Sequence, residues 1–125
     1  MEFAPDGFIA VGDKFRRAQA AWYEGLAAVA HAGTGVIVDE VFLDGGDSQE
    51  RLRIALGGLA VVWVGVRCQP EIAEARELQR SERIRGMARD QAERVHAGVS
   101  YDIVVDTTDT SSAKCATAIA ERVTA

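Results

Sequence analysis

The chain has 125 residues, a formal net charge of -5 and an apolar share of 48%. This length suits a single domain over residues 1–125 with a substantial core. The acidic balance argues against nucleic acid as a partner, because binding to a phosphate backbone needs a broad basic face. Cys68 and Cys115 lack metal-ligand spacing, which favours buried thiols in a reducing cytoplasm.

The apolar segments are too short for a membrane protein. The run LAVVWVGV at 59–66 cannot span a bilayer. The first residues, MEFAPDGF, have neither the basic nor the apolar region of a signal peptide. The sequence therefore predicts a cytoplasmic protein with no membrane partner.

The first elements in chain order are a hairpin and a helix. Apolar residues mixed with turn formers predict a short hairpin or extended entry over 8–15. Apolar steps of three and four then predict a helix from Lys14 to Ala32. Asp13 suits its N-cap, and Gly33 suits the position just past its end.

Two buried strands are predicted next, with a helix between them. The run GVIVDEVF at 35–42 is continuous and β-branched, as is typical of a buried parallel strand. A helix follows over 45–58, with Asp47 or Ser48 as its cap. The run LAVVWVGVRC at 59–68 predicts the second buried strand.

The last part of the chain continues the alternation of strand and helix. Pro70 suits the first turn of a helix whose periodicity extends to His96, with room for a break near Ser81 or Gly86. A third strand is predicted over 101–107 and a closing helix over 112–123. The order of elements predicts an α/β layer fold with a parallel sheet.

Asp39 ends the apolar run VIVDE at the carboxyl end of the predicted strand 35–42. Open α/β sheets bind ligands at that edge. An acid in this position is typical of the Walker B element, which holds Mg²⁺ directly or through water. The alternative is a loop residue, since acids are common in turns after strands. The pattern leaves both interpretations open.

Five arginines lie between Arg76 and Asp90 on this acidic chain. Arg76, Arg80 and Arg83 follow at i, i+4 and i+7, which forms one stripe on a helix. Convergent guanidinium groups fit the oxygens of a triphosphate. The alternative is a solvated helix face, as many charge runs are. The spacing does not decide between them.

The segment VDTTDTSSAKC at 105–115 offers hydroxyls and amides between a strand and a helix N-terminus. A nucleotide base or sugar could lie there, although a plain helix cap is the alternative. The sequence contains no GxxxxGK[ST] stretch, and neither Lys14 nor Lys114 follows a glycine-rich loop. No loop of the phosphate-cradling type is therefore expected in these residues.

Several blocks resemble chloramphenicol 3-O-phosphotransferase and its relatives. They are VWVGVRC, RIRGMA preceded by Arg76 and Arg80, VHAGVSYD and VDTT. The resemblance covers nearly all 125 residues, in the same order and at similar spacing. It implies a three-layer P-loop kinase fold with a parallel sheet, whose first two strands and P-loop this chain lacks. It also implies ATP-dependent phosphorylation, with Mg²⁺, of a primary hydroxyl on an antibiotic.

The resemblance also implies roles for single residues. Asp39 becomes the Walker B-like metal ligand. Arg80 and Arg83 become catalytic arginines of a lid that folds over the phosphates. The remaining nucleotide-binding set consists of Arg76, which supports the lid, and of Asp106, Thr107 and Thr108 near the base.

The family's Walker A loop and proposed catalytic base lie upstream of the residues present here. The missing first strand would lie between the predicted strands at 35–40 and 61–67. We therefore expect a small-molecule O-phosphotransferase that is inactive as this chain alone. We also expect the chain to be unstable, to self-associate through unpaired strands, or to pair its two inner strands directly.

Two alternatives remain open. One is a non-catalytic remnant that still binds a nucleotide or another ligand. The other is a generic α/β scaffold with a solvated basic helix.

Overall fold

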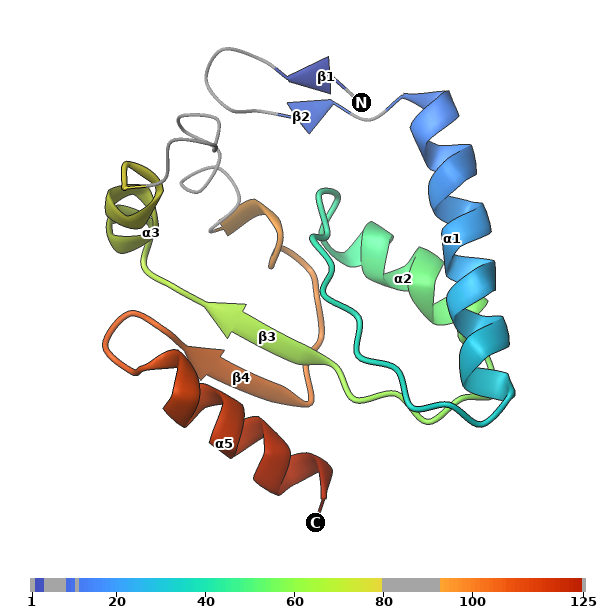
Figure 1. Cartoon of the computed structure of the whole chain (residues 1–125). Helices are drawn as coiled ribbons and strands as arrows, with labels where there is room; N and C mark the ends of the chain where they lie inside the picture. The colour runs from blue at the N-terminus through green and yellow to red at the C-terminus, as the bar shows by residue number, and fades with distance from the viewer. Residues whose placement is uncertain (1, 4–8, 11, 80–92, 125) are drawn as a thin grey trace.

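The computed structural model describes residues 2–3, 9–10, 12–79 and 93–124 (Figure 1). Two short strands, β1 (Glu2–Phe3) and β2 (Ile9–Ala10), pair antiparallel near the N-terminus. The hairpin or extended entry predicted over 8–15 is found only in part, because the two strands lie at 2–3 and 9–10 and residues 13–15 belong to the first helix. Among the described residues, no helix is both long and apolar enough to cross a bilayer.

Helix α1 (Asp13–His31) confirms the first predicted helix to within one residue at each end. Its N-cap is Gly12, which has no capping side chain, so the prediction of Asp13 as the cap was wrong. Asp13 lies in the first turn instead, where a carboxylate still favours the positive end of the helix dipole. The end was predicted correctly, because Gly33 follows it with φ 97° and donates its N–H to the Ala30 carbonyl at 3.0 Å.

Helix α2 (Gly46–Ala55) begins before the predicted caps Asp47 and Ser48, and neither caps it. The reason is a close backbone approach at Gly45, where a Cβ atom would lie 2.1 Å from the Ala97 carbonyl oxygen. Gly45 also has φ 56°, in the left-handed region that glycine enters without strain. Two backbones therefore meet where side chains would otherwise keep them apart.

The side chain of Gln49 fixes α2 to the segment that precedes the last strand. Its Nε2 donates to the Ser100 carbonyl at 2.7 Å, and the Ser100 N–H donates to its Oε1 at 2.9 Å. Gln49 is only 2% exposed. Both halves of this buried amide are satisfied, as a buried polar group requires.

The parallel sheet consists of β3 (Val64–Arg67) and β4 (Ile103–Asp106). Val64 lies opposite Ile103, and Arg67 lies opposite Asp106. The α/β class and the parallel pairing are thus confirmed, with two strands in this sheet rather than three. A strand within the predicted run 59–68 and one within 101–107 are also confirmed, each shorter than expected.

Helix α5 (Ser112–Val123) covers one face of β4 and has the predicted bounds (Figure 1). Ser111 caps it, since its Oγ accepts the Lys114 N–H at 3.2 Å. The small core combines Ile103 and Val105 of β4 with Cys115 of α5. Cys115 is buried as predicted, whereas Cys68 is only partly buried, so the prediction for Cys68 was wrong.

Tyr101 and His96 support the sheet from the segment before β4. The Tyr101 hydroxyl and His96 Nδ1 lie 2.5 Å apart. The Tyr101 ring packs on Gly65 of β3, where a Cβ atom would lie 2.7 Å from the ring. Burial, and then the charge of Arg67, lower the pKa of His96, so its imidazole is neutral at physiological pH.

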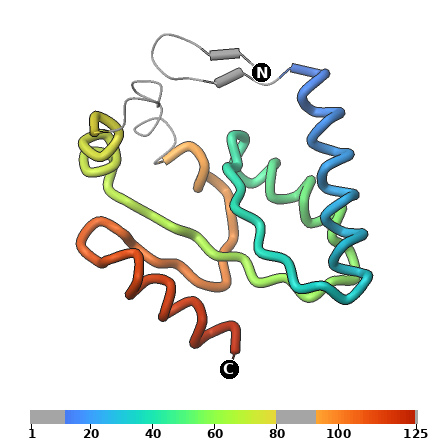
Figure 2. The backbone as a smooth tube through the Cα atoms, in the orientation of Figure 1, coloured from blue at the N-terminus to red at the C-terminus, as the bar shows by residue number. Residues whose placement is uncertain are grey.

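The predicted strand at 35–42 is absent, which is the largest difference from expectation. Residues 34–42 form neither helix nor strand and run back past α2 (Figure 2). Ile37 is 99% exposed. Direct pairing of the two inner predicted strands, one of the three expected outcomes, is not found, because residues 34–42 form no strand that could pair with β3. An apolar run forms a strand only where a neighbour receives its N–H and C=O groups.

Helix α3 (Pro70–Glu77) starts at the predicted proline, which occupies its first turn. It ends at Glu77 and is followed by a turn at Leu78 and Gln79, earlier than the break near Ser81 or Gly86 that the sequence allowed. Residues 80–92 lie outside the described part of the chain. The helical stripe expected beyond Arg76 therefore stays a prediction.

Candidate functional site

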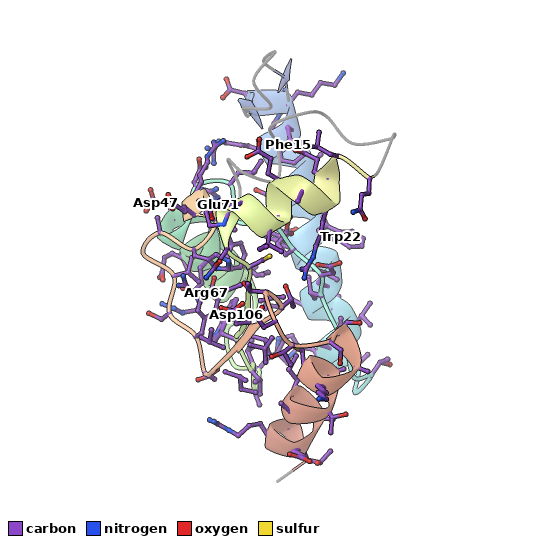
Figure 3. All side chains as sticks on the ribbon, turned by 90° about the vertical axis from the view of Figure 1, so that its left-hand side faces the viewer. Phe15, Trp22, Asp47, Arg67, Glu71 and Asp106 are labelled. Carbon is purple, nitrogen blue, oxygen red and sulfur yellow. The ribbon has the colours of Figure 1, made fainter. Side chains whose placement is uncertain are left out.

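The carboxyl ends of β3 and β4 form the edge at which parallel sheets usually bind ligands. Arg67 and Asp106 are the last residues of these strands and lie opposite each other (Figure 3). Two polar segments follow, residues 68–70 after β3 and residues 107–111 after β4. Adjacent strand ends thus bring polar groups from distant parts of the sequence together.

Asp106 organises the loop that follows β4. Its Oδ1 accepts the Thr108 N–H at 2.8 Å, which closes a short Asx-type turn. Hydrogen bonds from the Thr108 side chain and backbone lower the pKa of Asp106, and the charge of Arg67 lowers it further. Asp106 is therefore a carboxylate at neutral pH.

The two threonines hold this loop against the end of β3. The Thr107 N–H and hydroxyl donate to the Arg67 carbonyl at 2.8 and 3.2 Å. The Thr108 hydroxyl accepts the Gln69 N–H at 2.9 Å. The loop is thus tied to β3 through its backbone and through both side chains.

Arg76, in the last turn of α3, completes the fastening. Its Nη2 donates to the Thr107 carbonyl at 2.7 Å and to the Thr108 carbonyl at 3.4 Å, and its Nη1 donates to Thr107 Oγ1 at 3.2 Å. Its Nη1 also lies 3.5 Å from Cys68 Sγ. Both terminal nitrogens of this guanidinium are therefore used on protein acceptors. Arg76 positions the Thr107–Thr108 loop relative to α3.

The structure thus brings together four of the predicted site residues, which are Arg76, Asp106, Thr107 and Thr108. Arg80 and Arg83 lie outside the described residues, a few positions beyond Arg76. Asp39 is exposed and makes no hydrogen bond or ion pair within the part of the chain that the structure describes. Its role as a metal ligand stays a prediction.

A metal centre built from protein ligands alone is not found. Across residues 12–79 and 93–124, no group of three or more His, Cys, Asp and Glu side chains is placed to hold a metal ion. Mg²⁺ sites in phosphoryl-transfer enzymes use one or two carboxylates together with the phosphates of the nucleotide. A lone carboxylate such as Asp39 is compatible with that arrangement.

Sequence reasoning missed Arg67. Its guanidinium carbon lies 6.0 Å from the centre of the Tyr101 ring, and its charge acts on both Asp106 and His96. The available signal was a basic residue directly after an apolar run, at the edge where ligands bind. Arg67 thus adds a cation to the site, directly opposite Asp106.

A second polar cluster was also missed, between α1 and α2. Asp44 Oδ2 accepts from Arg16 at 2.7 Å and from Arg51 at 3.0 Å. The hydrogen bond from Arg16 is the main cause that lowers the pKa of Asp44, and Arg51 adds to it. No sequence motif indicated this cluster, because its members come from two helices and from the connection before α2.

The family described as chloramphenicol phosphotransferase-like protein matches residues 1–124. Two relatives, provisionally named O-phosphotransferases, come from two strains of Mycobacterium tuberculosis, and each is 35% identical over 88 residues.

Each of these matches covers 70% of this chain and 39% of the relative, so the chain spans about two fifths of the length of the curated relatives it matches. The names of the family and of both relatives indicate a phosphotransferase-like function for those proteins. The match over residues 1–124 agrees with the α/β architecture and its parallel sheet. The chain belongs to the chloramphenicol phosphotransferase-like proteins.

Proposed function

We propose that this chain is the base-side and lid portion of an ATP-dependent small-molecule O-phosphotransferase with a three-layer P-loop kinase fold. The observation that carries the proposal is the Arg76 fastening. It joins α3, which leads towards Arg80 and Arg83, to the Thr107–Thr108 loop at the carboxyl edge of the sheet. In this proposal α3 and the residues that follow it link the base end of a bound nucleotide to its phosphate end.

The base-side residues fit a nucleotide. The Asp106–Thr108 loop is polar and is held by the seven hydrogen bonds described above, which keeps its remaining acceptors in place for a base or ribose. Arg67 supplies a positive charge opposite Asp106. A loop fixed before the ligand arrives loses less entropy on binding.

The phosphate side fits less well. ATP, when bound, supplies the phosphoryl group, and Mg²⁺ offsets part of its charge. Within this proposal Asp39 holds the metal, while Arg80 and Arg83 stabilise the equatorial oxygens. The sequence has no GxxxxGK[ST] loop to cradle the phosphates. We therefore propose that the 125 residues alone do not turn over substrate.

The acceptor in this proposal is a hydroxyl of a small molecule, with the antibiotic chloramphenicol as the first candidate because the family bears its name. The reaction takes place in the cytoplasm. The exposed apolar run at 34–42 further favours self-association of the isolated chain.

A second candidate is a module that binds a nucleotide or ligand without catalysis. It is favoured by one observation, the lack of a GxxxxGK[ST] loop and of any lysine after a glycine-rich stretch. The two candidates differ in what precedes Met1 in the gene. A phosphotransferase gene encodes, in frame and upstream, a strand, a GxxxxGK[ST] loop and an Asp about twenty residues on. A stop codon directly upstream would favour the binding module.

The protein extended by that sequence tests the chemistry. It should transfer phosphate from ATP to chloramphenicol, and Arg83→Ala should lower kcat by about 10²–10³, as for loss of one charge-stabilising donor. Arg53→Ala is the matched control, since Arg53 is a half-exposed arginine of α2 that pairs with the exposed Glu50 at 2.6 Å and lies 6.0 Å from the centre of the Trp63 ring. Unchanged turnover in Arg83→Ala would favour a solvated helix face instead of a lid.

The Arg76 fastening has a separate test in calorimetry with two probes. In the extended protein, Arg76→Ala should weaken ATP about tenfold and leave inorganic tripolyphosphate unchanged, because only ATP uses the base-side loop. Equal weakening of both probes would show that Arg76 contacts phosphates directly.

A further inference from the structure

Arg53 and Arg67 lie in similar aromatic surroundings but differ in their partners. The guanidinium carbon of Arg53 lies 6.0 Å from the centre of the Trp63 ring. That of Arg67 lies 6.0 Å from the centre of the Tyr101 ring. Arg53 also pairs with Glu50 at 2.6 Å, whereas the Arg67 guanidinium has no hydrogen bond or ion pair within the described part of the chain. The N–H donors of Arg67 are therefore available to a ligand.

An acid nevertheless lies directly opposite Arg67. Asp106 is its cross-strand neighbour in the parallel sheet (Figure 3). Neighbouring strands lie about 4.8 Å apart, and opposite charges in such positions attract each other. No ion pair joins Arg67 to Asp106, although Arg16 and Arg51 both hold Asp44 elsewhere in the chain. A cation and an anion thus lie side by side without pairing.

Each of the two side chains has a contact of its own that holds it away from the other. The Arg67 guanidinium lies over the Tyr101 ring, which packs on Gly65. The Asp106 carboxylate accepts the Thr108 N–H at 2.8 Å and a hydrogen bond from the Thr108 hydroxyl. A carboxylate accepts about four hydrogen bonds, and Asp106 is exposed, so acceptor capacity remains. An exposed ion pair adds little stability, so the separation costs the fold little.

The position of the two groups defines the ligand that fits them. Both are exposed and lie on the face of the sheet opposite to α5, because the alternate residues Ile103 and Val105 pack under that helix. Asp106 repels a small anion, and Arg67 repels a small cation. A neutral group with an acceptor beside a donor meets neither repulsion and uses both side chains. The edge of adenine has this arrangement, since a ring nitrogen accepts and the neighbouring amino group donates.

We propose that Arg67 and Asp106 together bind the adenine edge of a nucleotide, with Arg67 donating to a ring nitrogen and Asp106 accepting from the amino group. The choice of adenine rests on the proposed function, since that function uses ATP. Arg76 has a different task, because both of its terminal nitrogens are used on protein acceptors. Arg67 therefore contacts the base, whereas Arg76 positions the loop beside it.

The test uses adenosine, which has the base but no phosphate, titrated into the 125-residue chain and followed through the amide shifts in NMR spectra. Arg67→Met keeps an apolar stem over the Tyr101 ring and removes the donors. Asp106→Asn keeps an acceptor for the Thr108 N–H and removes the charge. Each variant should weaken the binding of adenosine about tenfold.

Two matched controls make the same changes away from this edge. Arg53→Met removes a guanidinium at the same distance from an aromatic ring. Asp102→Asn changes a carboxylate that also accepts a backbone N–H, that of Trp63 at 2.8 Å, but lies just before β4 rather than at its end. Both controls should bind adenosine as the wild type does.

The purine riboside that lacks the amino group tests base recognition without changing the protein. The wild type should bind it about tenfold more weakly than adenosine. Asp106→Asn should bind the two compounds equally, because the variant and the analogue remove the same hydrogen bond.

Three results would overturn the proposal. They are equal affinity of the wild type for the two compounds, wild-type affinity for adenosine in Arg67→Met, and the absence of adenosine binding. Failure of phosphate transfer in the extended protein is a different outcome. If adenosine binding still depends on Arg67 and Asp106, that failure counts against the proposed function alone.

Discussion

Residues 34–42 and the run that contains β3 are similar in sequence but different in structure. Both are β-branched and apolar, with a glycine among the valines. β3 lies beside β4, whose Ile103 and Val105 pack under α5. Residues 34–42 pair with no strand among the described residues, and Ile37 is 99% exposed. The residue types are suited to a strand in both places, and the neighbour decides which one forms.

The exposed run at 34–42 also has the residue types that favour association between chains. Val36, Val38 and Val41 are exposed together with Ile37. Apolar segments without a strand partner tend to pair with another molecule. β3 is thus a paired, stabilising segment, whereas residues 34–42 contribute little to folding and are expected to favour association.

The largest expected effect comes from isoleucine-to-alanine changes in the two regions. Ile103→Ala should lower the free energy of unfolding by about 2–5 kcal/mol, because it leaves a cavity under α5. Ile37→Ala, the same change at an exposed site, should stay within about 0.5 kcal/mol. Urea unfolding measures both. A comparable loss in the two variants would mean that 34–42 is packed in solution.

Glycine-to-valine changes sharpen the comparison at the backbone. Gly65→Val should cost about 1–3 kcal/mol, because the new Cβ would lie 2.7 Å from the Tyr101 ring. Gly35→Val has nothing within 4 Å of its Cβ and should be nearly neutral. Thermal unfolding measures both. A destabilised Gly35→Val would reveal a neighbour to the exposed run.

A charge placed in the exposed run tests association. Ile37→Lys should shift the isolated chain towards monomer in sedimentation velocity, since charged residues block pairing of strand edges. Ile54→Lys is the control, because Ile54 is also exposed but lies on α2. If both variants associate like the wild type, the run at 34–42 is not the contact.

The smallest expected effect concerns Asp44, where the exposed run ends and joins α2. Arg16, and then Arg51, hold its pKa below the ordinary 3.8, so the folded chain binds this proton less readily than the unfolded chain. The stability from this group is complete above about pH 4 and is lost as the pH falls through the lowered value.

Because these side chains are about a third exposed, the contribution is at most about 1 kcal/mol. In Asp44→Asn, Tm should therefore fall less steeply as the pH is lowered below about 4 than in the wild type. An unchanged acid limb would show that solvent screens both pairs fully.

The elements that sequence patterns predicted well are those that depend on local chemistry. The bounds of α5 follow from its cap and its apolar spacing, and the end of α1 follows from Gly33. The strand at 35–42 and the caps of α2 were wrong, because they depend on what lies beside the segment. Gly45 meets Ala97 from a distant part of the chain, and no local pattern contains that contact.

The candidate site divides in the same way. The VDTT block and the arginine row pointed to Thr107, Thr108 and Arg76, and the structure joins them. Arg67 was missed because strand pairing alone places it opposite Asp106.

The Gln49 clamp also has a consequence for the chemical ageing of the protein. Its side-chain amide acts as a substitute peptide group, donating to the Ser100 carbonyl and accepting the Ser100 N–H. Deamidation would replace the donating nitrogen with a charged oxygen 2.7 Å from that carbonyl. Attraction at this buried joint would become repulsion, and α2 would detach from the segment that leads into β4. Chemical loss of the Gln49 amide would thus destabilise the folded state.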